Sequence, residues 1–176
     1  MSSLLTTQSI LRLLTLSGCL ITGAAAQADV YSDVARLTQE GNSAQAISQA
    51  NQYLSSNSRD PQMRFLKGMA QSKAGDIQAA TATFQSLIED YPELPEPYNN
   101  LAVIYASQNQ LDSAREALEM AVRNNPNYAV AHENLGDIYA RLAHSAYSRS
   151  LQLNERNQPL QLKLSTLTSM LLPAAR

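Results

Sequence analysis

Two stretches, EPYNNLAVIY at residues 96–105 and VAHENLGDIY at residues 130–139, are similar and lie 34 residues apart. Both contain Asn-Leu followed directly by a small residue, Ala102 or Gly136, and both end in an Ile-Tyr pair. Similar stretches at a fixed spacing of this size indicate an internal repeat in which each unit is one piece of supersecondary structure. Because one unit cannot bury its apolar face alone, the sequence predicts a stack of at least about three units.

The same spacing relates further positions along the chain. Small residues recur at 68, 102 and 136 and again at 80 and 114, glycine or asparagine at 41, 75 and 109, and proline at 92 and 126. Small residues let two antiparallel helices approach closely, glycine or asparagine breaks the chain between helices, and proline ends a helix. Larger side chains are expected to fill the spaces between units, and these are Phe84, Tyr105, Leu118 and Tyr139.

This pattern resembles the tetratricopeptide repeat (TPR), a 34-residue helical pair with the signature W-x2-L-G-x2-Y…A-x3-F…P. The resemblance implies an all-α fold, a right-handed helical solenoid of about four units with a C-terminal capping helix. The expected segments are a signal peptide at 1–28, a degenerate unit at 29–60, repeats at 61–94 and 95–128, a shortened repeat at 129–157 and the capping helix at 158–176. The fullest match is the unit at 95–128, through Tyr98, Leu101, Ala102, Tyr105, Ala114, Leu118, Ala121 and Pro126.

The last repeat departs from the signature because its turn is missing. Between Ile138 and Leu153 there is no Gly, Pro, Asn or Asp. We therefore expect one helix from about 130 to 154, with a tight turn near residues 143–144 as the alternative. Gly136 occupies the small position of this repeat, so a leucine there is expected to overpack a helix crossing.

A final helix is expected after the polar residues 154–158. Pro159 suits the first turn of a helix, with Asn157 or Gln158 as its cap. The expected role of this helix is to cover the end of the stack, and the alternative is that it dimerises or docks a partner. Its apolar stripe consists of Leu160, Leu164, Leu167 and Leu171.

The N-terminal residues predict export. An apolar run at 13–23 follows Arg12 and is itself followed by AAAQA at 24–28, which is the pattern of a signal peptide cleaved after Ala26 or Ala28. The alternative is the stretch LSGC at 16–19, which resembles the lipobox of bacterial lipoproteins and would make Cys19 a lipidated residue. The chain is therefore expected to be periplasmic or exported, or else an outer-membrane-anchored lipoprotein.

Charge and cysteine content exclude several classes of protein. The formal net charge is −2 and no basic run occurs, so the sequence offers no electrostatic footprint for nucleic acid. Cys19 is the only cysteine, so an intramolecular disulfide is impossible.

No catalytic, cofactor-binding or metal-binding pattern emerges, and we expect a protein that is not an enzyme. His132-Glu133 begins like the zinc motif H-E-x-x-H, but Gly136 stands where the second histidine is required. His132 occupies an aromatic position of the repeat and is expected in the core. The second histidine, His144, is expected at the surface or at the altered junction. No nucleophile elbow, phosphate-binding loop or dinucleotide fingerprint occurs.

The resemblance also implies where a partner would bind. The first helices of TPR units line a concave groove that holds peptides or extended segments. The Lys and Asn clamp with which some members hold chaperone C-termini is absent here. The expected surface runs from apolar to acidic, which suits a segment with apolar anchors and a basic end. Its residues are Phe65, Met69, Asn99, Val103, Glu133 and Asp137.

An alternative for Phe65 and Met69 is that they pack against the first unit as core. Taken together, the sequence predicts a periplasmic TPR adaptor or scaffold for protein–protein interactions in the cell envelope. Its partner is an unspecified protein or peptide. The alternative is a membrane-anchored TPR lipoprotein acting as a pilotin-like assembly factor through Cys19, in which case alone a membrane is also a partner.

Overall fold

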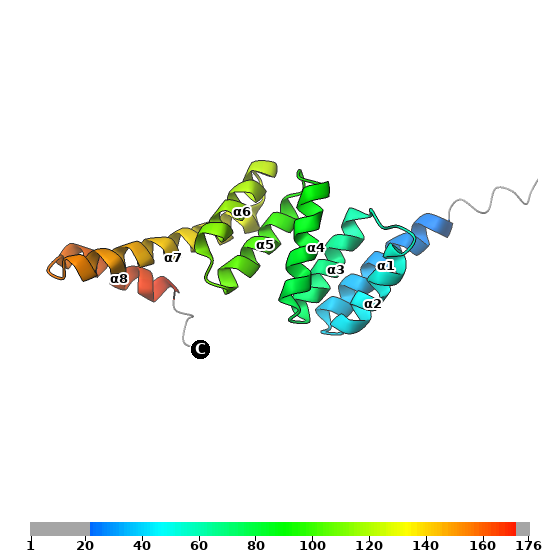
Figure 1. Cartoon of the computed structure of the whole chain (residues 1–176), viewed down its shortest axis with the longest axis horizontal. Helices are drawn as coiled ribbons and strands as arrows, with labels where there is room; N and C mark the ends of the chain where they lie inside the picture. Colours follow the sequence, from blue (N-terminus) through cyan, green and yellow to red (C-terminus); the bar gives the residue numbers. More distant parts are fainter. Residues whose placement is uncertain (1–21, 172–176) are drawn as a thin grey trace, which may run out of the picture. The chain divides into compact units, whose positions relative to one another are not determined.

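The structure is a computed structural model that describes residues 22–171, with only the backbone course of residues 22–29. Within this range the chain forms eight α-helices and no strand (Figure 1), which confirms the predicted all-α class. The predicted lipidation residue, Cys19, lies outside the described residues. The chain divides into two compact units, one ending at Ala74 and the other beginning at Gly75, and each unit is described by itself.

The first unit contains three mutually packed helices, α1 (Thr22–Gln39), α2 (Ser43–Leu54) and α3 (Pro61–Lys73). Gly41, with φ of 83°, makes the left-handed turn between α1 and α2 that favours a residue without a Cβ. The core mixes large side chains from α1 and α3 with small ones that let the helices approach closely. Its buried members are Val34, Leu37, Ala46, Ala50, Met63 and Ala70.

Asp60 ties the three helices of the first unit together. Its Oδ1 accepts a 2.8 Å hydrogen bond from the backbone N–H of Met63 and so caps α3, where Pro61 follows at the first helical position. Its Oδ2 accepts a 2.5 Å hydrogen bond from the Tyr31 hydroxyl, which lies 2.9 Å from the Tyr53 hydroxyl. Burial, and then the bond to Asp60, raises the pKa of Tyr31.

The second unit contains α4 (Ile77–Asp90), α5 (Pro95–Ser107), α6 (Leu111–Asn124), α7 (Ala129–Leu153) and α8 (Gln158–Leu171). Each helix packs on the next, and α5 also touches α7. Ala102 and Ala114, two of the predicted small residues, are buried where α5 meets α6, and Phe84 of α4 is fully buried. The largest buried cluster consists of Tyr98, Ala102, Ala114, Ala117, Leu118, Ala121, Ala131 and Ile138.

The shortened repeat forms one helix instead of a hairpin. Helix α7 runs without a break from Ala129 to Leu153, through the sequence that lacks turn-forming residues. Helix α8 then packs back along it, and the side chain of Asn157 caps α8 by accepting a 3.2 Å bond from the N–H of Leu160. Leu160 is buried whereas Leu162 is 69% exposed, so the predicted leucine stripe of α8 is its packing face.

Three sequence expectations for α7 are wrong, and they share one cause. Tyr139 is 49% exposed, His132 is exposed with Nε2 2.9 Å from the carbonyl oxygen of Pro126, and Gly136 has no atom within 4 Å of where a Cβ would lie. In a complete repeat these positions are covered by a short second helix. That helix is missing because α7 continues instead of turning back.

Candidate partner-binding surface

Two of the six predicted partner-binding residues lie on α3 of the first unit. Met69 is 38% exposed, whereas Phe65 is half-buried and already interacts with other residues of the chain. Met69 is therefore the more accessible of the two, and Phe65 combines a packing role with a partly exposed edge.

The other four residues lie on α5 and α7 of the second unit, and one of them is used internally. Asn99 is only 7% exposed, and its Oδ1 accepts a 2.8 Å hydrogen bond from Nδ2 of Asn134. This partly buried amide pair joins the second turns of α5 and α7. Asn99 therefore does not present its side chain to a partner, although its place in the repeat suggested that it would.

A second link joins α5 and α7 about two turns further along. Arg141 on α7 donates a 3.1 Å bond from Nη1 to the carbonyl oxygen of Ala106 and a 3.3 Å bond from Nη2 to Oδ1 of Asn109. The two helices are thus held in register at both ends of their shared surface. Sequence reasoning did not foresee that Arg141 fixes α7 against α5.

Between these two links lies a hollow of about 370 Å³ lined in part by Val103 and Asp137. Val103 is 52% exposed and Asp137 is also exposed, so both can be reached by a partner. Met170 and Leu171 from the end of α8 line the same hollow. Their contribution was missed because it depends on how α8 folds back along α7.

The predicted acidic residue Glu133 is exposed on α7 but does not line this hollow. It lies one turn from Asp137 on the same helix, so the two carboxylates extend the acidic character of the surface beyond the hollow. The hollow therefore combines an apolar wall with a carboxylate, and Arg141 is held against backbone and amide oxygens at its end.

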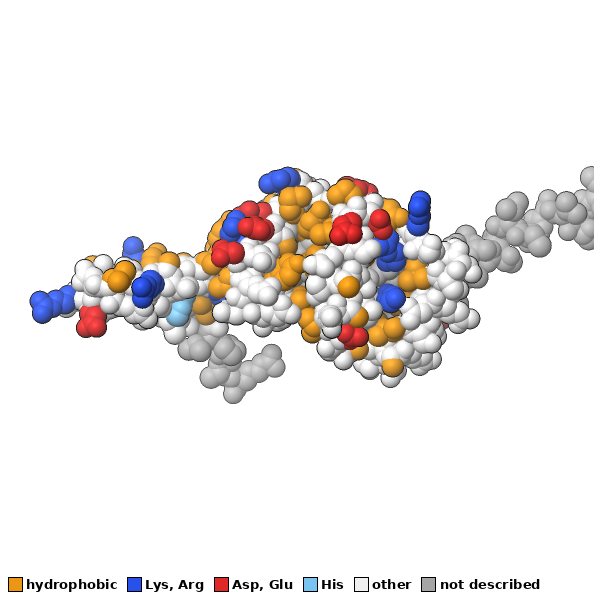
Figure 2. Space-filling view, viewed as in Figure 1, with side chains coloured by type: hydrophobic (Ala, Val, Ile, Leu, Met, Phe, Trp, Pro, Cys, Tyr) orange, Lys and Arg blue, Asp and Glu red, His pale blue; other side chains and the backbone are white. Residues whose placement is uncertain are grey.

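The outer surface of α6 and α7 carries a separate group of charges. Arg115 donates a 2.8 Å bond to Oε1 of Glu119, which also accepts a 3.1 Å bond from the Tyr139 hydroxyl. The bond from Arg115, and then the bond from Tyr139, lower the pKa of Glu119. The bond to Glu119 in turn raises the pKa of Tyr139. Figure 2 shows acidic and basic side chains gathered over this part of the unit.

Neither histidine belongs to a candidate metal site. Within residues 22–171, no group of three or more His, Cys, Asp or Glu side chains is placed to hold a metal ion. No helix in the same range is long and apolar enough to cross a membrane.

Comparisons with known proteins agree with this description. One tetratricopeptide repeat model matches residues 71–138 and another matches residues 36–95. The chain is 32% identical over 95 residues to a Pseudomonas putida protein named "Probable biofilm formation methyltransferase WspC". That match spans 54% of this chain but only 22% of the relative, so it does not extend to the relative's full length.

Two similar solved structures are complexes with peptides. The first TPR of Spaghetti (RPAP3), bound to an HSP90 peptide, gives a TM-score of 0.60 at 15% identity, over 66% of this chain and 92% of that one. The Yersinia enterocolitica type III secretion chaperone SycD, in complex with a peptide of the translocator YopD, gives a TM-score of 0.59 at 14% identity. That match covers 66% of this chain and 95% of the chaperone. At these identities the likeness is one of fold.

Proposed function

Because the chain belongs to the tetratricopeptide repeat family, whose models together match residues 36–138, we propose that it is a non-catalytic adaptor that holds segments of other proteins in the bacterial cell envelope. Repeats of this family mediate protein–protein interactions through the surface formed by their first helices. Non-catalytic binding is favoured by the inventory of the described surface, which has accessible apolar and acidic side chains on a fixed pair of helices.

The observation that carries the proposal is the pairing of Val103 with Asp137 in the hollow between α5 and α7. The links Asn99–Asn134 and Arg141–Ala106 hold these helices in place, so the surface does not have to be ordered when a partner binds. An apolar wall beside a carboxylate suits an extended segment that has an apolar anchor followed by a basic residue.

Site-specific photo-crosslinking in cells tests this surface directly. A photoreactive amino acid in place of Val103 is expected to give discrete adducts with a partner, because this side chain is half-exposed in the hollow. The matched control is the same amino acid in place of Glu116, which is exposed on α6 and does not line the hollow. Asp137→Lys is expected to abolish the adducts at position 103, and equal adducts at both positions would contradict the proposal.

The first unit is proposed to contribute Met69 and the exposed edge of Phe65. The double variant Phe65→Ala, Met69→Ala is expected to abolish co-purification of the crosslinked partner without unfolding the chain. Since Phe65 is half-buried, Met69→Ala alone serves as the variant with the smaller effect on packing. An unchanged set of co-purified proteins from both variants would remove α3 from the binding surface.

Location in the envelope rests on the predicted leader, and two forms of the protein are distinguished by mass. Cleavage after Ala26 or Ala28 gives an exported periplasmic adaptor. Cleavage before Cys19 with lipidation gives a membrane-anchored assembly factor, an alternative favoured by the LSGC stretch at 16–19. The intact mass of the purified mature protein separates the two, and a mass that retains residues 1–18 would contradict both.

A further inference from the structure

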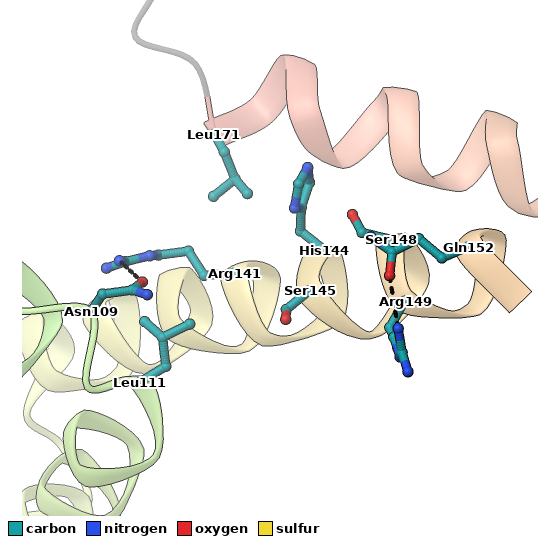
Figure 3. Close-up of a pocket in the computed structure, with 9 residues that line it drawn as sticks. All are labelled: Asn109, Leu111, Arg141, His144, Ser145, Ser148, Arg149, Gln152 and Leu171. Atoms are coloured by element: carbon teal, nitrogen blue, oxygen red, sulfur yellow. Dashed lines mark hydrogen bonds between the residues drawn. The ribbon is translucent and has the colours of Figure 1, made fainter.

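A second and larger hollow, of about 630 Å³, lies beside the part of α7 that extends beyond the repeat. It is bounded by the turn between α5 and α6, by three turns of α7 and by Leu171 at the end of α8 (Figure 3). The hollow exists because α7 continues past Arg141, where the first helix of a complete repeat would end. It is therefore a feature of this chain's own last hairpin.

The charges around this hollow are basic, in contrast to the rest of the second unit. Its charged lining residues are Arg141 and Arg149, and no acidic side chain of the described chain lines it. His144 also lines it, with Nε2 3.1 Å from Oγ1 of Thr168 on α8. Residues 75–137 contain ten acidic and two basic side chains, whereas residues 138–171 contain one acidic and four basic ones. In Figure 2 the charged side chains along the α7–α8 hairpin are mostly basic, whereas acidic ones gather over α6.

The two arginines are held by neutral acceptors, so their charges are not compensated within the hollow. Arg141 bonds to the carbonyl oxygen of Ala106 and to Oδ1 of Asn109, and Arg149 donates a 3.0 Å bond to Oε1 of Gln152. A guanidinium has five N–H donors, so each arginine keeps donors for a further acceptor. An anionic group would find charge-assisted bonds at either residue.

Hydroxyl groups and apolar walls complete the lining. The side chains of Ser145 and Ser148 form no hydrogen bond with any described residue, and Leu111 and Leu171 supply apolar surface. Figure 3 shows Arg141 directed toward the α5–α6 turn and His144 directed toward α8. The hollow can therefore receive both carboxylates and an apolar side chain.

The positions of the two arginines along α7 indicate what kind of anion fits. Arg149 follows Arg141 by eight residues, so their backbone positions are about 12 Å apart along the helix axis. A single phosphate cannot reach both ends of such a row, whereas carboxylates four residues apart in an extended chain are about 13 Å apart. We propose that this hollow binds an acidic segment of a partner protein, with its carboxylates at Arg141 and Arg149 and an apolar side chain against Leu111 and Leu171.

This hollow shares Arg141 and Leu171 with the hollow of Val103 and Asp137, but its other lining residues differ, so it gives the adaptor a second contact of opposite charge preference. The test uses the full mature chain and the capped peptide acetyl-EALAE-amide, with acetyl-QALAQ-amide as its neutral match. Binding is followed by the NMR shifts of the backbone amides of Ser145 and Ser148. The acidic peptide is expected to move both resonances, and the neutral peptide is expected to leave them in place.

Arg149→Gln is expected to weaken binding of the acidic peptide at least fivefold without changing the helix content. Arg123→Gln, which removes an exposed arginine of α6 outside the hollow, is expected to leave affinity unchanged. Equal binding of both peptides, or equal affinity of Arg149→Gln and the parent chain, would overturn the proposal.

Three further outcomes would also overturn it and would identify what the hollow or the peptide does instead. Shifts confined to Val103 and Asp137 would place the peptide in the hollow between α5 and α7 instead. Inorganic phosphate that moves Ser145 and Ser148 as strongly as the peptide would indicate a simple anion site. Binding to phosphatidylglycerol vesicles that depends on Arg149, without peptide binding, would indicate a membrane contact. Crosslinking through Val103 tests the adaptor function independently of these results.

Discussion

Asn109 shows how a single residue serves both the backbone and the neighbouring helix. The two preceding turns at this spacing use Gly41 and Gly75 with φ of 83° and 81°, whereas Asn109 has φ of 60°. Asparagine tolerates this left-handed conformation better than most residues with a Cβ. Its side chain also supplies the Oδ1 that accepts a bond from Arg141, which glycine could not provide.

The first prediction separates these two roles of Asn109. Asn109→Ala loses the acceptor and places a less tolerant residue in the left-handed region, so it should lower the free energy of unfolding by about 1 kcal/mol. Asn109→Gly loses the same bond but relieves the backbone, so it should stay within about 0.5 kcal/mol of the parent. Urea denaturation measures both, and equal losses in the two variants would show that the bond to Arg141 dominates.

Glu119 provides a prediction about pH. The bond from Arg115 is the main cause that lowers its pKa, and the more distant charge of Arg123 is a minor one. Arg115→Gln should therefore raise the pKa of Glu119 clearly toward the ordinary value of 4.5, and Arg123→Gln should raise it less. NMR titration of the side-chain carboxyl carbon measures the two changes, and the reverse order would contradict the assignment.

The sign of the stability effect follows from the direction of that shift. A carboxyl whose pKa is lower in the folded state favours folding at pH values above its unfolded pKa. For Glu119 this contribution is lost as the pH falls from about 4.5 through the lower folded value. The parent chain should therefore lose stability over this window more steeply than Arg115→Gln does.

At the scale of elements, α7 differs from α5, the first helix of the preceding repeat, because no second helix of its own repeat covers it. Tyr98 of α5 lies in the buried cluster with side chains of α6, whereas His132 at the same repeat position of α7 is exposed. A leucine at Gly136 was expected to overpack a helix crossing, but the position faces open space.

The third prediction follows from that space. Gly136 lies inside a helix, and a Cβ there would meet no atom within 4 Å. Gly136→Ala should raise the free energy of unfolding by about 0.5–1 kcal/mol, because alanine loses less backbone entropy on forming the helix. Gly75→Ala is the matched control, since its Cβ would also meet nothing but its φ is 81°, and it should be destabilising. A loss of stability in Gly136→Ala would mean that another element covers this position.

The sequence allowed much of this fold to be predicted because the repeat encodes local features. Caps such as Asn157, helix-starting prolines such as Pro159 and buried small residues such as Ala114 act over one helix or one helix pair. What failed depends on a missing neighbour: Tyr139 keeps the repeat residue, but the helix that would cover it is absent. The prediction that Asn99 faces a partner failed for a different reason. The sequence of a polar residue on a groove face does not indicate whether its side chain bonds to a partner or, as Asn99 does with Asn134, to its own chain.

At the scale of the whole molecule, the buried residues are distributed unevenly along the second unit. Helix α5 buries six residues, among them Leu101 and Ile104, whereas α8 buries only Leu160. In α7 the buried residues are Ala131 and Ile138, both in its first half. Local stability follows the number of buried apolar contacts, so a single continuous helix is expected to contain two regions of different stability.

Hydrogen exchange tests whether α7 contains two regions of different stability. Amides of residues 143–171 should exchange faster than those of α5, α6 and the first half of α7, because the hairpin opens without disrupting the main cluster. Leu160→Ala should accelerate exchange about tenfold or more within the hairpin and leave α5 and α6 unchanged. Leu118→Ala, which removes a 1% exposed side chain of the main cluster, should instead reduce protection in α5, α6 and α7 together. If Leu160→Ala reduced protection in α5 as much as in α8, the hairpin and the main cluster would unfold as one cooperative element. The hollow of Arg141 and Arg149 would then be as rigid as the hollow of Val103 and Asp137, instead of lying on a part of the chain that opens on its own.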